Sequence, residues 1–145
     1  MRKYHLRWAE EWPDEIFDLY DEEWKSKFEN QDGVYVLGSS DNTMFTYPWG
    51  SSPIFYIGKS VNLIKRLRSH RKGILQAAED HNSKYFRPKN QYGAAFGADT
   101  AVFYLKDFDD LGKYESKMIT DFYDTYGSIP VGNGAWPKSI LTEDD

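Results

Sequence analysis

Three short segments rich in β-branched and aromatic residues constrain the fold of this chain more than any other feature of its sequence. They are residues 33–38, 54–58 and 101–105, and each has the length and composition of a β-strand. Residues 43–47 could add a further short strand, whereas 48–53 has the proline and glycine content of a loop. Helical periodicity before, between and after these segments predicts a small sheet with helices packed around it.

Four segments carry the apolar spacing of amphipathic helices. Residues 13–30 begin with Pro13 and acidic residues, and their apolar residues recur at i, i+4 spacing. Residues 61–73, with Ser60 as a plausible cap, form a basic helix that 74–80 could continue as a second one. The helix predicted at 111–126 ends before Gly127. Its inward-facing residues are expected to be Leu111, Met118, Ile119, Phe122 and Tyr126.

The order of these segments predicts an α+β fold. Its centre would be a small antiparallel sheet, three-stranded or four-stranded if 43–47 joins it, with 33–38 and 54–58 paired as a hairpin. With 145 residues the chain is long enough for one domain. We expect residues 1–32 to contribute an amphipathic helix that packs on a single globular unit formed by 33–145. Residues 82–98, which are polar and rich in glycine, are expected to form a long loop.

Composition excludes several classes of protein. The sequence has no cysteine, which rules out disulfides, thiolate metal sites and cysteine nucleophiles. No apolar run approaches the roughly 20 residues of a membrane span, and the start of the chain lacks the apolar stretch of a signal peptide. We therefore expect a cytoplasmic protein with no membrane partner.

The charge is unevenly distributed. The net charge is −5, yet residues 59–89 carry nine Lys or Arg against two Asp or Glu. A binding partner responds to charges within about 10 Å, so this local surplus matters more than the total. It predicts a surface for nucleic acid, although a solvated basic helix has the same composition.

Two motifs at the strand positions resemble those of the GIY-YIG nucleases. Gly33-Val34-Tyr35 is followed by Phe55-Tyr56-Ile57-Gly58, and Arg66 comes ten residues after Tyr56, preceded by an Asn-Leu pair. Glu115, on the helix after the third strand, and Asn133, in the closing segment, come in the family's order. The resemblance covers residues 33–133. It implies a GIY-YIG endonuclease-like fold and a metal-dependent endonuclease that hydrolyses phosphodiester bonds.

The residue types suit that chemistry. Glu115 is a hard oxygen ligand, and Mg²⁺ or Mn²⁺ often binds through one or two carboxylates with waters completing the shell. Arg66 can fork two hydrogen bonds onto a phosphate. His70, four residues later on the same helix face, could act as acid, base or phosphate donor, and Lys59 could add a cation. Each could instead be an ordinary surface or helix residue.

The resemblance also assigns two tyrosines to the site. Tyr35 is interpreted as the general base and Tyr56 as the group that orders the water, although the two roles could be exchanged. Phenols are poor bases at neutral pH unless cations assist them. The two residues are 21 positions apart, about twice the usual spacing of the family. The intervening residues must therefore loop out or add a strand, and could form a contact surface.

The expected partner is nucleic acid, with DNA favoured over RNA. Contacts to it are assigned to Lys59, Lys65, Arg68, Arg71, Lys72 and Asn133, although Asn133 could instead only close the Gly-Asn-Gly turn in which it stands. Because no separate DNA-reading domain is visible, a homodimer or a targeting partner protein could supply specificity. The alternative function is a catalytically inactive module that binds nucleic acid or protein on the same scaffold.

Overall fold

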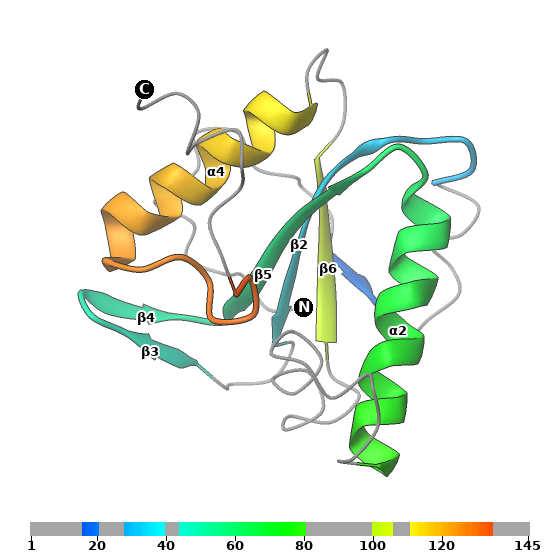
Figure 1. Ribbon diagram of the computed structural model, residues 1–145, viewed down its shortest axis with the longest axis horizontal. Coiled ribbons are helices and arrows are strands. Elements are labelled where there is room, and N and C mark those ends of the chain that lie inside the picture. The colour runs from blue at the N-terminus through cyan, green and yellow to red at the C-terminus, as the bar shows by residue number, and fades with distance from the viewer. Residues whose placement is uncertain (1–15, 21–27, 40–43, 81–99, 106–110, 135–145) are drawn as a thin grey trace.

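The computed structural model describes residues 16–20, 28–39, 44–80, 100–105 and 111–134, which form a small sheet with a helix on either side (Figure 1). In chain order the elements are β1 (Ile16–Asp18), β2 (Gly33–Ser39), β3 (Phe45–Tyr47), β4 (Gly50–Ser52), β5 (Ile54–Ser60), α2 (Leu63–Glu79), β6 (Thr100–Leu105) and α4 (Leu111–Tyr126). The α+β prediction is confirmed as antiparallel strands packed against helices. The predicted 82–98 loop lies outside the described residues.

Within these ranges, the sheet has four strands in the order β1-β6-β2-β5, and every neighbouring pair is antiparallel. The predicted hairpin relation is confirmed, because β2 pairs with β5. The fourth strand is β1, whereas 43–47 was the expected candidate. Residues 45–47 instead form β3, which pairs only with β4 in a separate hairpin. The prediction of loop for 48–53 was therefore wrong at Gly50–Ser52.

The N-terminal segment departs most from the sequence-based expectation. The predicted helix at 13–30 is wrong at Ile16–Asp18, where β1 pairs with β6. The Asp18 carboxylate then accepts a hydrogen bond from the Tyr20 amide at 2.8 Å, which forms an Asx turn and ends the strand. Pairing with a distant strand here outweighs the local helical spacing, because β1 covers what would otherwise be an open edge of β6. Residues 13–15 and 21–27 lie outside the described part.

Strand β2 is the centre of the structure. All seven of its residues are buried, which requires cover on both faces of the sheet. Figure 1 shows α2 and α4 on opposite sides of the strands. Leu19 and Phe28, from the N-terminal region, are buried in the same hydrophobic core.

Helix α2 is a single helix of 17 residues, where two were expected. Its N-cap is Asn62, whose side chain accepts from the Lys65 amide at 3.1 Å. The predicted cap, Ser60, lies two residues earlier and bonds to the backbone of Asn62. Val61, expected on the apolar face, is 83% exposed because it precedes the first helical turn. The residues buried along the helix are Leu63, Leu67, His70, Gly73, Ile74 and Ala77.

Helix α4 has the predicted bounds, and all but one of its expected inward residues are buried. The exception, Leu111, is partly buried against the core. The helix ends at Gly127, whose φ of +79° is the left-handed conformation that glycine adopts freely. Neither α2 nor α4 combines the length and apolar composition needed to cross a lipid bilayer.

Candidate active site

Pairing of β2 with β5 places the two motif tyrosines beside one glycine. Tyr35 lies opposite Gly58 in the register, and Tyr56 precedes Gly58 by two residues on the same face of β5. A Cβ at Gly58 would lie 2.5 Å from the Tyr35 hydroxyl oxygen and 2.8 Å from Cε1 of Tyr56. The absence of a side chain at Gly58 therefore makes the room that both rings occupy.

The Tyr35 hydroxyl is held by two residues of α2. It lies 2.5 Å from Nε2 of His70 and accepts a hydrogen bond from Nε of Arg66 at 3.3 Å. Arg66 and His70 are four residues apart, so one helix face delivers both groups to the sheet. The His70 ring also meets the rings of Tyr35 and Tyr56 edge-on, with centroids 5.3 and 5.0 Å away.

Burial distinguishes the two tyrosines. Tyr35 has no exposed surface, whereas Tyr56 is only partly buried. Burial, followed by the neighbouring Tyr56, raises the pKa of Tyr35 well above its usual value, and Arg66 opposes this only in part. Tyr35 is therefore a neutral hydroxyl at physiological pH, with no direct access to solvent.

Glu115 reaches the same region from the second turn of α4. Partial burial raises the pKa of its carboxyl, while Lys59 and Arg66 lie near enough to lower it. Burial acts to lower the pKa of the Arg66 guanidinium, but its interactions with Tyr35 and Tyr56 outweigh burial and raise it. Arg66 is therefore near both the tyrosines and, through its charge, Glu115. The structure thus brings together residues from β2, β5, α2 and α4. They are Tyr35, Tyr56, Lys59, Arg66, His70 and Glu115.

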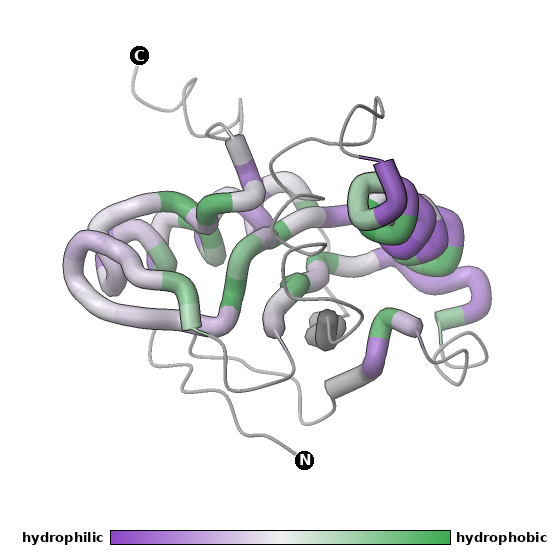
Figure 2. Tube along the Cα trace, turned by 90° about the horizontal axis from the view of Figure 1, so that it is seen from below, coloured by the Kyte–Doolittle hydropathy of each residue, from purple (hydrophilic) through white to green (hydrophobic). Residues whose placement is uncertain are grey.

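The remaining basic residues of α2 do not join this cluster. Lys65, Arg68 and Lys72 are exposed and Arg71 is partly buried. All four lie about 100° or more around the helix axis from Arg66 and His70. Figure 2 shows α2 at the right, nearly end-on and coloured largely hydrophilic. Any nucleic acid contacts they make lie outside the cluster.

The side chain of Asn133 bonds to the backbone of β5. Its side-chain NH₂ donates to the Ile57 carbonyl at 2.8 Å, and its side-chain oxygen accepts from the Ile57 amide at 3.0 Å. The Gly132 amide bonds to the Phe55 carbonyl at 2.6 Å, so the closing segment covers the outer edge of β5. The expected role of Asn133 in binding nucleic acid is untested, but the contacts assign it to the strand that carries Tyr56.

The carboxylate of Glu115 limits which metal ions this site could hold. Among the described residues, no group of three or more His, Cys, Asp or Glu is arranged to enclose an ion. A single hard oxygen ligand fits Mg²⁺ or Mn²⁺ with a shell completed by water.

Sequence reasoning identified these polar residues but did not single out Gly58. The importance of Gly58 could have been inferred from the two motifs, since their antiparallel pairing brings Tyr35 opposite Gly58. Comparison of this chain with protein-family models, curated proteins and solved structures found no match. Its functional interpretation therefore depends on the geometry of the cluster and on the motifs that predicted it.

Proposed function

We propose that this chain is a GIY-YIG-type nuclease that hydrolyses phosphodiester bonds with Mg²⁺ or Mn²⁺, with DNA favoured over RNA. The observation that carries the proposal is the convergence on Arg66. The Nε of this residue donates a hydrogen bond to the Tyr35 hydroxyl, and its positive charge lies near enough to Glu115 to lower the pKa of that carboxyl. Tyr35 and Tyr56 lie on β2 and β5, Arg66 lies on α2, and Glu115 lies on α4, the helix that follows β6.

Hydrolysis of a phosphodiester forms a bond from a water oxygen to phosphorus and breaks the bond to the departing oxygen, which takes up a proton from solvent. Arg66 would neutralise the phosphoryl oxygens with its terminal NH₂ groups, because its Nε already bonds to Tyr35. Lys59, which is exposed at the end of β5, would add a second positive charge. A divalent ion bound by Glu115 would polarise the phosphoryl group and acidify water.

Tyr56 is the better of the two tyrosines to contact the attacking water, because Tyr35 is fully buried and its pKa is raised. The roles expected from the sequence are therefore exchanged in this proposal. Tyr56 orients the water and accepts a proton from it. At the same time the phenolic proton of Tyr56 passes to the Tyr35 hydroxyl, and the proton of Tyr35 passes to Nε2 of neutral His70. The hydrogen bond between Tyr35 and His70 and the packing of the Tyr56 ring against Tyr35 support this path, and neither phenol has to ionise in advance.

The proposal is tested by comparing Arg66→Ala with Arg68→Ala. Both remove one positive charge from the first half of α2, but only Arg66 faces the cluster. With Mg²⁺ or Mn²⁺ on single-stranded, duplex and branched DNA and on RNA, we expect Arg66→Ala to lower the cleavage rate about 10²-fold or more. Arg68→Ala should stay within a few-fold of wild type. Equal losses in both variants would show that overall charge, and not the cluster, supports cleavage.

The alternative, an inactive binding module, makes a different prediction for Glu115. A protein that only binds nucleic acid gains affinity when a carboxylate near the phosphate is neutralised. Glu115→Gln would then bind nucleic acid as tightly as wild type or more tightly, and neither protein would cleave any substrate. The partial burial of Glu115 between two cations favours the enzyme, since a binding surface has no need of it.

A further inference from the structure

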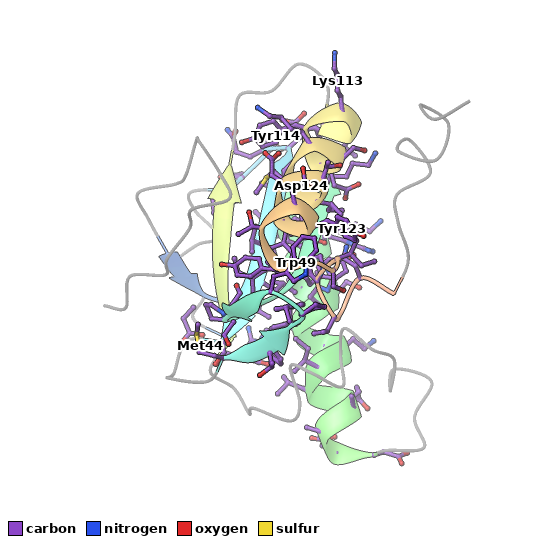
Figure 3. All side chains as sticks on the ribbon, turned by 90° about the vertical axis from the view of Figure 1, so that its left-hand side faces the viewer. Met44, Trp49, Lys113, Tyr114, Tyr123 and Asp124 are labelled. Carbon is purple, nitrogen blue, oxygen red and sulfur yellow. The ribbon has the colours of Figure 1, made fainter. Side chains whose placement is uncertain are left out.

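Two exposed aromatic rings pack against each other at the far end of α4 from Glu115. Trp49, in the turn between β3 and β4, is 66% exposed, and Tyr123 is 38% exposed. Their ring centroids are 6.4 Å apart at an interplanar angle of 62°. Figure 3 shows the two side chains together, with Asp124 nearby and Lys113 at the opposite end of the helix. We call Trp49 and Tyr123 the aromatic platform.

The turn that carries Trp49 is held in place by contacts with the end of α4 and with the core. The Trp49 amide donates to the Tyr126 carbonyl at 3.0 Å, which satisfies one of the open carbonyls at the end of α4. The indole lies over Gly127, where a Cβ would come within 2.8 Å of Cδ2. Tyr47, next to the turn, is buried against Phe122 and donates to the Ile54 carbonyl at 2.7 Å. Because the rings are already ordered, a ligand that stacks on them loses little conformational entropy by binding.

The position of the platform relates it to the cluster. Tyr123 follows Glu115 by eight residues, which is about 12 Å along the helix axis at 1.5 Å per residue. That distance corresponds to about three or four nucleotides at the 3.4 Å spacing of a stacked strand. A strand whose phosphate lies at Glu115 could therefore bring a base about three or four nucleotides away to the platform.

Charge and size indicate which part of such a strand would bind. Residues 44–58 contain no charged side chain, and Asp121 and Asp124 lie beside Tyr123 on α4. This surface would repel phosphates but accept the uncharged face of a base. Two rings are also far smaller than the roughly 800 Å² that each partner buries in a stable protein interface.

We propose that the aromatic platform stacks on an unpaired nucleobase about three or four nucleotides from the cleavage position, so that the preferred substrate carries a single-stranded segment there. In a duplex each base face is covered by its neighbours, whereas an unpaired base can stack on aromatic side chains. This inference rests on the proposed nuclease function. It extends that function from phosphodiesters in general to nucleic acids with single-stranded flanks or branches.

Binding without metal tests the platform independently of cleavage. The probe is a fluorescently labelled single-stranded oligothymidylate, and its affinity is measured by anisotropy in the presence of EDTA. We expect Trp49→Ala to weaken binding roughly five- to a hundredfold and Trp49→Phe to weaken it less, because stacking on each base has that magnitude. Tyr123→Ala should also weaken binding, and serves if Trp49→Ala fails to fold. Met44→Ala, which removes an exposed apolar side chain outside the platform, should bind like wild type.

The outcomes separate this inference from the proposed function. If wild type cleaves but Trp49→Ala and Tyr123→Ala bind and cleave single-stranded flanks normally, the platform has no role and only the nuclease proposal stands. If no substrate is cleaved but binding depends on Trp49, the platform stands and the nuclease proposal fails. The inference is overturned if every variant binds the oligonucleotide like wild type, or if the Trp49 and Tyr123 substitutions affect binding of a protein but not of the oligonucleotide.

Discussion

The Gly58→Ala substitution tests the geometry of the site with the smallest change that the chain allows. A methyl group at this position would lie 2.5 Å from the Tyr35 hydroxyl and 2.6 Å from Cζ of the same ring. Ordinary contacts begin near 3.4 Å, so the Tyr35 hydroxyl would have to move by about 0.9 Å. It cannot do so freely, because His70 and Arg66 hold its oxygen.

The expected destabilisation is about 1–3 kcal/mol, which is typical of overpacked cores. For a chain of this size that lowers Tm by about 3–10 °C. Cleavage should fall by about 10²-fold, because a displacement near 1 Å in a catalytic group has that effect. The assays are thermal unfolding followed by circular dichroism and single-turnover cleavage with metal.

Gly50→Ala is the matched control. Gly50 is also a strand glycine, but its added Cβ would first meet Tyr126 at 3.4 Å, an ordinary contact. Its Tm should stay the same or rise slightly, because alanine restricts the unfolded chain. The steric reasoning is refuted if Gly58→Ala folds and cleaves like wild type, or if both variants lose the same amount.

Three further substitutions test the charge, the core and the edge of β5. Because burial raises the pKa of Glu115, the folded state retains this proton to a higher pH than the unfolded state, so its stability falls as pH rises through that interval. Glu115→Gln should therefore gain stability relative to wild type with rising pH in urea unfolding without metal, and a constant difference would contradict this. Phe122→Ala, which empties the space under Tyr47, should cost about 3–5 kcal/mol in the same assay, and a loss below 1 kcal/mol would contradict the packing. Asn133→Ala leaves the amide and carbonyl of Ile57 without their side-chain partner and should cost about 1–3 kcal/mol, with faster hydrogen exchange at Ile57; unchanged exchange would show that this contact does not form in solution.

Elements whose signals are local were predicted well. The strand at Gly33–Ser39 and the helix at Leu111–Tyr126 have composition and periodicity that agree with their final environment. The segment at Ile16–Asp18 does not, because its conformation is set by pairing with β6, more than eighty residues away in the sequence. Periodicity within a short window carries no information about such a partner.

The candidate site shows the same division. The motifs predicted which polar residues would gather, but the distribution of burial between the tyrosines depends on the layer that α2 adds over the sheet. The α2 residues illustrate this. Arg66 and Arg68 are equivalent in composition, and only the rotation of the helix separates the one that reaches Tyr35 from the one that faces solvent. Similarly, the bonds of the Asn133 side chain to the Ile57 backbone could not be predicted, because the two residues are 76 positions apart, and its contact with nucleic acid stays a prediction.

The extra residues between the two tyrosines were expected to loop out or to add a strand. They form the β3–β4 hairpin, which does not join the main sheet. Its anchors on α4 and β5 come from Tyr47 and from the Trp49 backbone, contacts that depend on the position of the helix end. The sequence predicted that this region would protrude, but it did not indicate that its turn would carry an ordered, exposed tryptophan.

Single-turnover cleavage by Glu115→Gln, set beside Glu79→Gln, addresses the nuclease proposal most directly. Both variants remove one helix carboxylate, but Glu79 is exposed at the end of α2, whereas Glu115 lies beside Lys59 and Arg66. With Mg²⁺ or Mn²⁺ and a branched DNA substrate, Glu79→Gln should cleave at the wild-type rate and Glu115→Gln should be folded but inactive. Equal rates in the three proteins, or no metal-dependent cleavage by wild type on any DNA or RNA, would contradict the assignment of these residues to phosphodiester hydrolysis.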